Sequence, residues 1–276
     1  MLASLLMPAV TSSFARLPAN ATFARAVSIA AVLTTDSPAL GSQRGTWTPS
    51  EPTALDVDPG LARMPTTLTD VSDSHWVLTV ELDPRHATGH SNLIFALDFN
   101  DSYDIRDHQA ERYRWNEQHA EPLAGDIAPH RNDPNPERKL RIGYVSADFR
   151  RHSAVNGFGP MIRHFDRDGF DVICYASNVA EDDVTEALRG SATEWRACSR
   201  LGHEQLAHLI RDDAIDILVD LSGHSAGNRL LVFARKPAPV QVHAWGFATG
   251  TGLSTMDYFL SDPVVVPEEE RGLYAE

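Results

Sequence analysis

Apolar and polar positions divide the chain into three parts. Residues 1–70 show no lasting hydrophobic period, and residues 36–70 are rich in Thr, Ser, Pro and Asp. Such a composition is typical of a disordered leader and linker. Helical spacing dominates residues 71–130, and short apolar runs dominate residues 138–276. We therefore expect a disordered leader, a short helical segment and an α/β domain.

Two helices are predicted in residues 71–130. After Pro84, apolar residues recur on one helical face, at Ala87, Leu93, Ile94, Ala96 and Leu97. A second helical stretch covers residues 105–125, and the polar segment 131–139 that follows it predicts a domain boundary. His86 and His90 are spaced i, i+4. With no third ligand nearby, we interpret them as surface residues rather than metal ligands.

Five short apolar runs in the third part predict buried strands, at residues 140–149, 170–177, 215–223, 239–246 and 257–263. Helical patterns lie between them. Short buried strands that alternate with helices indicate a parallel, Rossmann-like sheet of the doubly wound type. Ligands of such sheets bind beyond the carboxyl ends of the strands.

Composition narrows the function. The 276 residues carry a formal net charge of −14, which argues against nucleic acid and anionic membrane as partners. The two cysteines, Cys174 and Cys198, are too few for a disulfide framework, so a cytoplasmic setting is expected. No apolar run is long enough to span a bilayer.

Polar residues follow several predicted strands directly. Asp148 and His152 follow the first strand, His224 and Ser225 the third, and a Gly/Thr loop at residues 246–252 the fourth. The loop offers backbone N–H groups and hydroxyls to phosphate or sugar oxygens. A histidine at the same edge can move a proton near neutral pH. These features together predict a ligand site there.

Residues 223–227, Gly-His-Ser-Ala-Gly, also match the G-x-S-x-G pattern of serine hydrolases. In α/β-hydrolases an acid and then a histidine follow the serine. Only His243 follows Ser225, and no Asp or Glu lies between them. A GxSxG serine hydrolase is therefore kept only as a distant alternative.

Four segments together resemble one family of proteins. They are RIGYVSADFRRHS, IDILVDLSGHSAGNRL, FARKPAPVQVHAWGFATGTGL and MDYFLSDPVVVPEEERGLYAE. They are similar to the O-linked N-acetylglucosamine transferase / SPINDLY family, in particular to bacterial members with tetratricopeptide repeats, over residues 80–276. The resemblance implies the N-terminal half of a GT-B fold, preceded by a repeat-like helical end. It implies inverting transfer from UDP-GlcNAc to serine or threonine hydroxyls of proteins, with no cofactor and no required metal.

The resemblance also implies site residues. His152 falls on the histidine of the family's D-F-x-x-H motif, a general base or a donor-phosphate contact. The Gly223–Gly227 loop falls on a G-H-T-x-G loop, with Ser225 keeping the hydroxyl. The predicted catalytic residues are His152 and His224, and the predicted substrate-binding residues are Asp148, Ser225, Gly250, Thr251 and Gly252. A relative transfers fucose from GDP-fucose, so fucose stays an alternative sugar.

The resemblance ends with the first half of the transferase. The family's second half supplies most of the nucleotide site, and its motifs do not occur in this sequence. We therefore expect a truncated copy, whose C-terminal half is missing, with little or no transfer by the chain alone, because catalysis needs preorganised charge around the leaving diphosphate. The alternative is a non-catalytic half-domain that binds a peptide or a partner chain.

Overall fold

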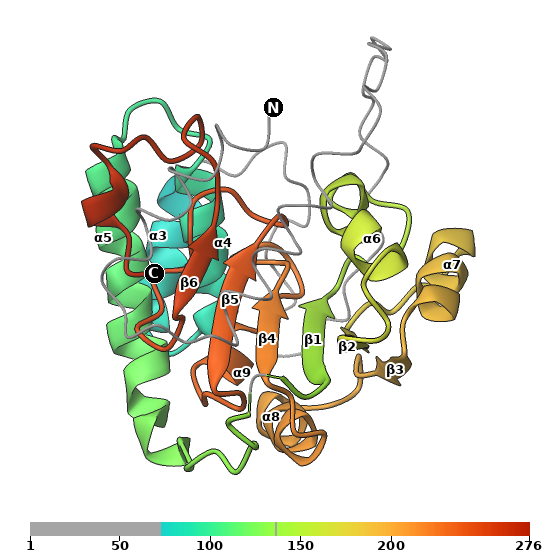
Figure 1. Ribbon diagram of the computed structural model, residues 1–276. Coiled ribbons are helices and arrows are strands. Elements are labelled where there is room, and N and C mark those ends of the chain that lie inside the picture. Colours follow the sequence, from blue (N-terminus) through green and yellow to red (C-terminus); the bar gives the residue numbers. More distant parts are fainter. Residues whose placement is uncertain (1–72, 136) are drawn as a thin grey trace, which may run out of the picture.

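A computed structural model describes residues 73–135 and 137–276 (Figure 1). The leader predicted at residues 1–70 lies outside these residues. The described part contains a helical segment, from α3 (Asp73–Leu82) to a short 3-10 turn (Glu121–Asp126), and a six-stranded sheet with its own helices.

The sheet is parallel throughout and has the strand order β3-β2-β1-β4-β5-β6. Its strands are β1 (Leu140–Ser146), β2 (Phe170–Ala176), β3 (Glu194–Ala197), β4 (Ile217–Asp220), β5 (Val240–Ala244) and β6 (Tyr258–Leu260). The order reverses between β1 and β4, which lie side by side with Ile142 opposite Ile217. This is the doubly wound order, so the expected Rossmann-like α/β class is confirmed.

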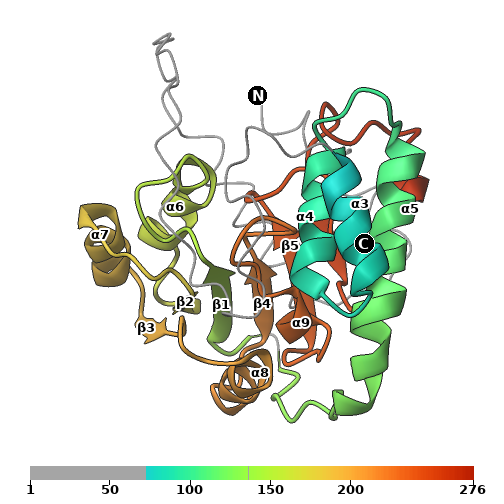
Figure 2. The same cartoon turned by 180° about the vertical axis from the view of Figure 1, so that it is seen from behind.

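Helices cover both faces of the sheet. On one face α6 (Val155–Arg163) and α7 (Asp183–Ser191) pack against Val172 and Val219. On the other face, α8 (His203–Asp212) and α9 (Leu230–Phe233) share a core with α4 (Ala87–Leu97) and α5 (Ile105–Trp115). Figure 2 shows α3, α4 and α5 in front of β5. The helical segment is therefore one of the layers that bury the sheet.

The two predicted helices of the N-terminal segment are present. Asp104 accepts hydrogen bonds from the backbone N–H groups of Arg106 and Asp107, so α5 begins with a capping box. After Trp115 the helix continues as one π-helical turn, Asn116–Ala120, before the 3-10 turn that holds Pro122. Near the other end of the chain, Arg271–Leu273 forms another 3-10 turn.

The structure corrects three expectations. A sixth strand, β3, was missed because it is a four-residue edge strand carrying Glu194 and Arg196, so it shows no apolar run. The strands are also shorter than predicted, and β4 covers only residues 217–220. His90 is 1% exposed and not a surface residue: its ring contacts Glu111 at 2.8 Å and His119 at 3.0 Å.

Candidate active site at the carboxyl edge of the sheet

The loop after β1 carries the most exposed candidate, His152. Asp148 is 8% exposed, and its backbone N–H donates to the Ser146 hydroxyl at 2.9 Å. His152 is exposed, and its Nδ1 lies 3.8 Å from an Asp148 carboxylate oxygen. The same Nδ1 accepts the backbone N–H of Ala154 at 3.3 Å. In this arrangement the neutral ring carries its proton on Nε2, while the nearby carboxylate favours a proton on Nδ1. Nε2 is a base only in the other tautomer, in which the proton is on Nδ1.

The loop after β4 has a strained, compact backbone. Gly223 has φ +52°, and a Cβ there would lie 2.5 Å from the Phe247 side chain, so only glycine fits. The Ser225 hydroxyl donates to the Ser222 carbonyl at 2.7 Å. Between Gly227 and Ala147 the β4 and β1 loops approach closely, since a Cβ on Gly227 would lie 2.8 Å from that of Ala147.

No histidine of residues 73–135 and 137–276 hydrogen-bonds the Ser225 hydroxyl. His224 and His243 are engaged elsewhere: His224 bonds Ser91 and Thr251, and His243 bonds Asp220 and Phe247. A hydrolase nucleophile needs a base at its hydroxyl. The geometry gives the hydrolase alternative no support.

His224 lies inside the protein. It is 1% exposed, its Nε2–H donates to the Thr251 carbonyl at 2.9 Å, and its Nδ1 accepts the Ser91 hydroxyl at 3.2 Å. Burial holds the pKa of His224 well below its usual value, so the ring is neutral. Both ring nitrogens are already used. The catalytic role predicted for His224 stays a prediction, and this arrangement favours a role in holding loops together.

The Gly250–Gly252 loop is also buried. Gly250 and Gly252 have φ values of +77° and +73°. The Thr251 backbone N–H and hydroxyl each donate to a carboxylate oxygen of Glu276 at 2.5 Å, and the Gly252 N–H donates to the same oxygen at 3.2 Å. Consecutive backbone N–H groups in this conformation form an anion-binding nest, and here the nest binds the side-chain carboxylate of Glu276.

The predicted residues thus fall into separate groups and differ in their exposure to solvent. His152 is exposed, Ser225 is half-buried, and Asp148, His224, Gly250, Thr251 and Gly252 are buried. One group contains Asp148 with His152; another contains His224 with Thr251. No hydrogen bond among the described residues joins His152 to His224.

A buried pair that is absent from the predicted site residues supports the loops after β4 and β5. Asp220 and His243 are opposite each other in the β4–β5 register, and their side chains meet at 2.8 Å. Asp220 also accepts the backbone N–H groups of Ser222 and Gly223, and His243 Nε2–H donates to the Phe247 carbonyl. A charged residue inside an apolar strand, aligned with a histidine of the next strand, was the signal that could have found the pair.

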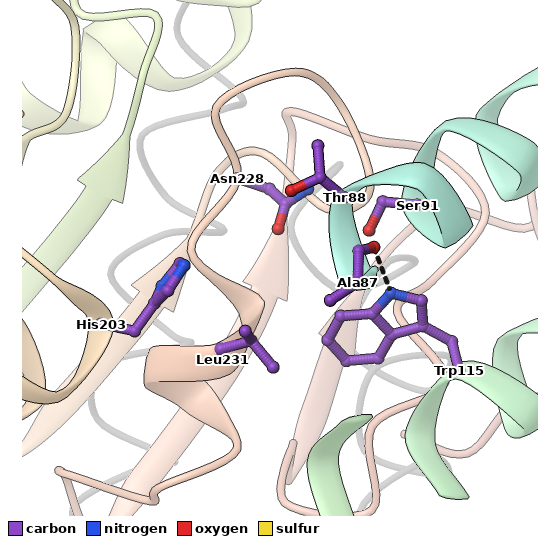
Figure 3. A pocket seen from close by; sticks show the side chains of 7 residues that line it. All are labelled: Ala87, Thr88, Ser91, Trp115, His203, Asn228 and Leu231. Carbon is purple, nitrogen blue, oxygen red and sulfur yellow. Dashed lines mark hydrogen bonds between the residues drawn. The ribbon is translucent and has the colours of Figure 1, made fainter. Parts of the chain in front are cut away.

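A small hollow lies between the helical segment and the sheet domain (Figure 3). Its lining residues are Ala87, Thr88, Ser91, Trp115, His203, Asn228 and Leu231. The volume of about 30 Å³ suits a water molecule or two and is far too small for a sugar nucleotide. Burial, helped by Arg229, lowers the pKa of His203 to about 4, so this ring is neutral. None of the predicted site residues lines the hollow.

Within residues 73–135 and 137–276, no group of three or more His, Cys, Asp or Glu side chains is arranged to hold a metal ion. None of the helices in this part of the chain is long and apolar enough to cross a membrane.

A doubly wound sheet with polar loops at its switch point defines a Rossmann-like α/β protein, a class of fold whose ligands bind beyond the carboxyl ends of the strands. The sequence model of glycosyl transferase family 41 matches residues 119–276, more than half of the chain. The chain belongs to this family, and the resemblance inferred from its motifs is confirmed.

Relatives and a solved structure agree. A protein of Arabidopsis thaliana described as a probable UDP-N-acetylglucosamine–peptide N-acetylglucosaminyltransferase SPINDLY is 31% identical over 199 residues, 69% of this chain and 21% of its own length. A Caenorhabditis elegans UDP-N-acetylglucosamine–peptide N-acetylglucosaminyltransferase is 33% identical over 141 residues, 50% of this chain and 12% of its own. The structure of a Thermobaculum terrenum O-GlcNAc transferase mutant matches with 37% identity and a TM-score of 0.70, covering 74% of this chain and 39% of that one. The chain therefore spans about a fifth of the length of the Arabidopsis relative.

Proposed function

We propose that this chain is part of a transferase that moves N-acetylglucosamine from UDP-GlcNAc to serine or threonine hydroxyls of proteins. Membership of glycosyl transferase family 41 and the similarity to peptide N-acetylglucosaminyltransferases support the donor and the acceptor class. The observation that carries the proposal for this chain is the accessible His152 beside Asp148, on the loop after β1.

The proposed chemistry is a single displacement with inversion. The acceptor hydroxyl oxygen attacks the anomeric carbon, the bond from that carbon to the UDP β-phosphate oxygen breaks, and UDP leaves with the bonding electrons. The hydroxyl proton moves to His152 Nε2, which is a base when Nδ1 carries its proton toward Asp148. The proposed step uses no metal.

The test is transfer of labelled sugar to acceptor proteins by the 276-residue chain. We expect little transfer from UDP-GlcNAc by this chain alone, and any measurable transfer should fall at least about 100-fold in His152→Ala because general-base assistance is lost. His208→Ala is the matched control, since His208 is an exposed histidine on α8 and should leave the rate unchanged.

Other outcomes point elsewhere. Transfer from GDP-fucose instead would change the sugar but keep the reaction class. Transfer that His152→Ala leaves intact would remove His152 from the chemistry. Binding of acceptor peptide with no transfer of either sugar would favour the non-catalytic peptide-binding alternative.

A further inference from the structure

Side chains of the helical segment reach into the Thr249–Gly252 loop after β5. Gln109 of α5 donates to the Thr249 carbonyl at 2.9 Å. Ser91 of α4 bonds His224, which in turn donates to the Thr251 carbonyl. Thr249 and Thr251 are therefore held by α4 or α5, and Gly250 is held by Arg112 of α5. Arg112 makes more of these contacts than the other side chains.

Arg112 is 0% exposed, and nearly all of its donors are used. One terminal nitrogen contacts both Asp98 carboxylate oxygens, at 2.7 and 2.6 Å, and the Thr249 hydroxyl at 2.6 Å. Nε donates to the Gly250 carbonyl at 3.2 Å, and the other terminal nitrogen to the His108 carbonyl at 2.9 Å. Asp98 neutralises the buried guanidinium, as a buried charge requires.

The fit depends on the shape of arginine and on the small size of the loop residues. A planar guanidinium donates in several fixed directions at once, whereas a lysine ammonium is a compact point charge. The Thr249 hydroxyl is needed as well, because it accepts from Arg112 and donates to Asp98 at 2.9 Å. At Gly252 a Cβ would lie 2.5 Å from the Arg112 Cβ, so arginine and loop backbone are in direct contact.

We propose that Arg112 is a positioning residue for the sugar-transfer site: with Asp98 and Thr249 it fixes the Thr249–Gly252 loop, so α4 and α5 form part of that site. The role of the loop in transfer rests on the proposed function. Control of the loop's conformation by Arg112 does not rest on it and can be measured separately.

The test is amide hydrogen exchange on the full 276-residue chain, resolved at Thr251, Gly252 and Leu253. Arg112→Lys and Thr249→Val should each speed exchange at these amides about tenfold, because the loop loses its fixed partners. Thr249→Ser keeps the hydroxyl and should remain within about twofold of the native chain. Arg114→Lys is the control, since Arg114 lies on the same helix, with a side chain 69% exposed and paired with Glu111.

Amides of β1 report the stability of the sheet and should not change in Thr249→Val. Loop exchange at the native rate in both Arg112→Lys and Thr249→Val would overturn the proposal, and so would equal acceleration in β1. If Arg112→Lys does not fold, the Thr249→Val and Thr249→Ser pair still decides the question.

A transfer assay on the same variants separates this inference from the proposed function. Faster loop exchange together with reduced kcat in Thr249→Val, restored in Thr249→Ser, supports both. Faster loop exchange in a chain that transfers no sugar supports the positional claim and counts against the function. Transfer unaffected by a loosened loop would show that Arg112 does not position the site.

Discussion

At the scale of single residues, the buried Asp220–His243 pair is the most consequential feature of the sheet. Both side chains are 0% exposed. Both nitrogens of His243 face acceptors, the Asp220 carboxylate and the Phe247 carbonyl, and this geometry favours the doubly protonated ring. Burial by itself lowers the pKa of His243, but hydrogen bonding and attraction to Asp220 outweigh it, and the net shift is upward.

The stability that this pair contributes should depend on pH. A group whose pKa is raised on folding stabilises the folded chain fully at pH values below its pKa in the unfolded chain, here 6.5. This contribution to stability is lost as the pH rises through the pKa of the folded state. We expect the Tm of the native chain to fall from pH 6.5 upward more steeply than that of His243→Gln. Thermal unfolding followed by circular dichroism from pH 6 to 9 measures both, with His208→Gln as the exposed control. Parallel curves for the native chain and His243→Gln would contradict a charged His243.

At the scale of elements, Asp216, the residue before β4, holds the connection between the helical segment and the sheet. Its carboxylate accepts from Asn132 at 2.7 Å, from Arg138 at 2.5 and 2.7 Å, and from the backbone N–H of Arg141 at 2.9 Å. Burial would raise its pKa, but these donors, Arg138 first, lower it overall. The segment that sequence composition predicts as a boundary is therefore bound to the sheet.

Asp216→Asn should lower the free energy of unfolding by ~2 kcal/mol, because a charged acceptor of several hydrogen bonds is lost. A group whose pKa is lowered on folding stabilises the folded chain at pH values above its pKa in the unfolded chain, 3.8. This contribution to stability is lost as the pH falls through the pKa of the folded state. The difference between native and variant should therefore be largest near neutral pH and shrink below pH 4. Urea unfolding at pH 7 and pH 3.5 provides the comparison. Asp212→Asn, on the last turn of α8, serves as the control. If the native chain and Asp216→Asn differ equally in unfolding free energy at both pH values, the charge of Asp216 does not contribute to the stability.

At the scale of the whole molecule, the helical segment and the sheet share one hydrophobic core. Ile94 of α4 and Trp115 of α5 belong to the same buried cluster as Leu218 of β4 and Phe233 of α9. The Trp115 ring nitrogen donates to the Ala87 carbonyl at 3.1 Å, which also joins α5 to α4 (Figure 3). We infer that residues 73–135 and the sheet unfold together, although a domain boundary near residue 130 was predicted.

Trp115→Ala should destabilise both parts by about 3–5 kcal/mol, because it empties the space between them. Amide exchange of α4 and of β4 should then accelerate by the same factor. Tyr103→Ala, at a ring 40% exposed, is the control and should change neither. Acceleration confined to α3–α5 would show that the helical segment is an independent domain.

The sequence predicts those parts of the fold whose signals are local in the chain, and it misses those that depend on distant residues. Apolar runs of seven to ten residues located five strands, since burial between two helical layers forces such runs. β3 escaped because it is an edge strand with the alternating polar residues Glu194 and Arg196. His90 was misjudged because its partners, Glu111 and His119, lie 21 and 29 residues away.

The features of the candidate site also divide into those with local sequence signals and those that depend on tertiary packing. The amino-acid sequence by itself determined the α/β class, the family and the loops that carry Asp148, His152, His224 and Thr251, because strand periodicity and motif order are local properties of the chain. Only the tertiary structure decided that His152 is exposed while His224 is buried, and that Arg112 holds the loop after β5. Arg112 lies 138 residues from Gly250, so their contact exists only once α5 has packed onto the sheet. Exposure and protonation depend on such distant neighbours, which no local pattern contains.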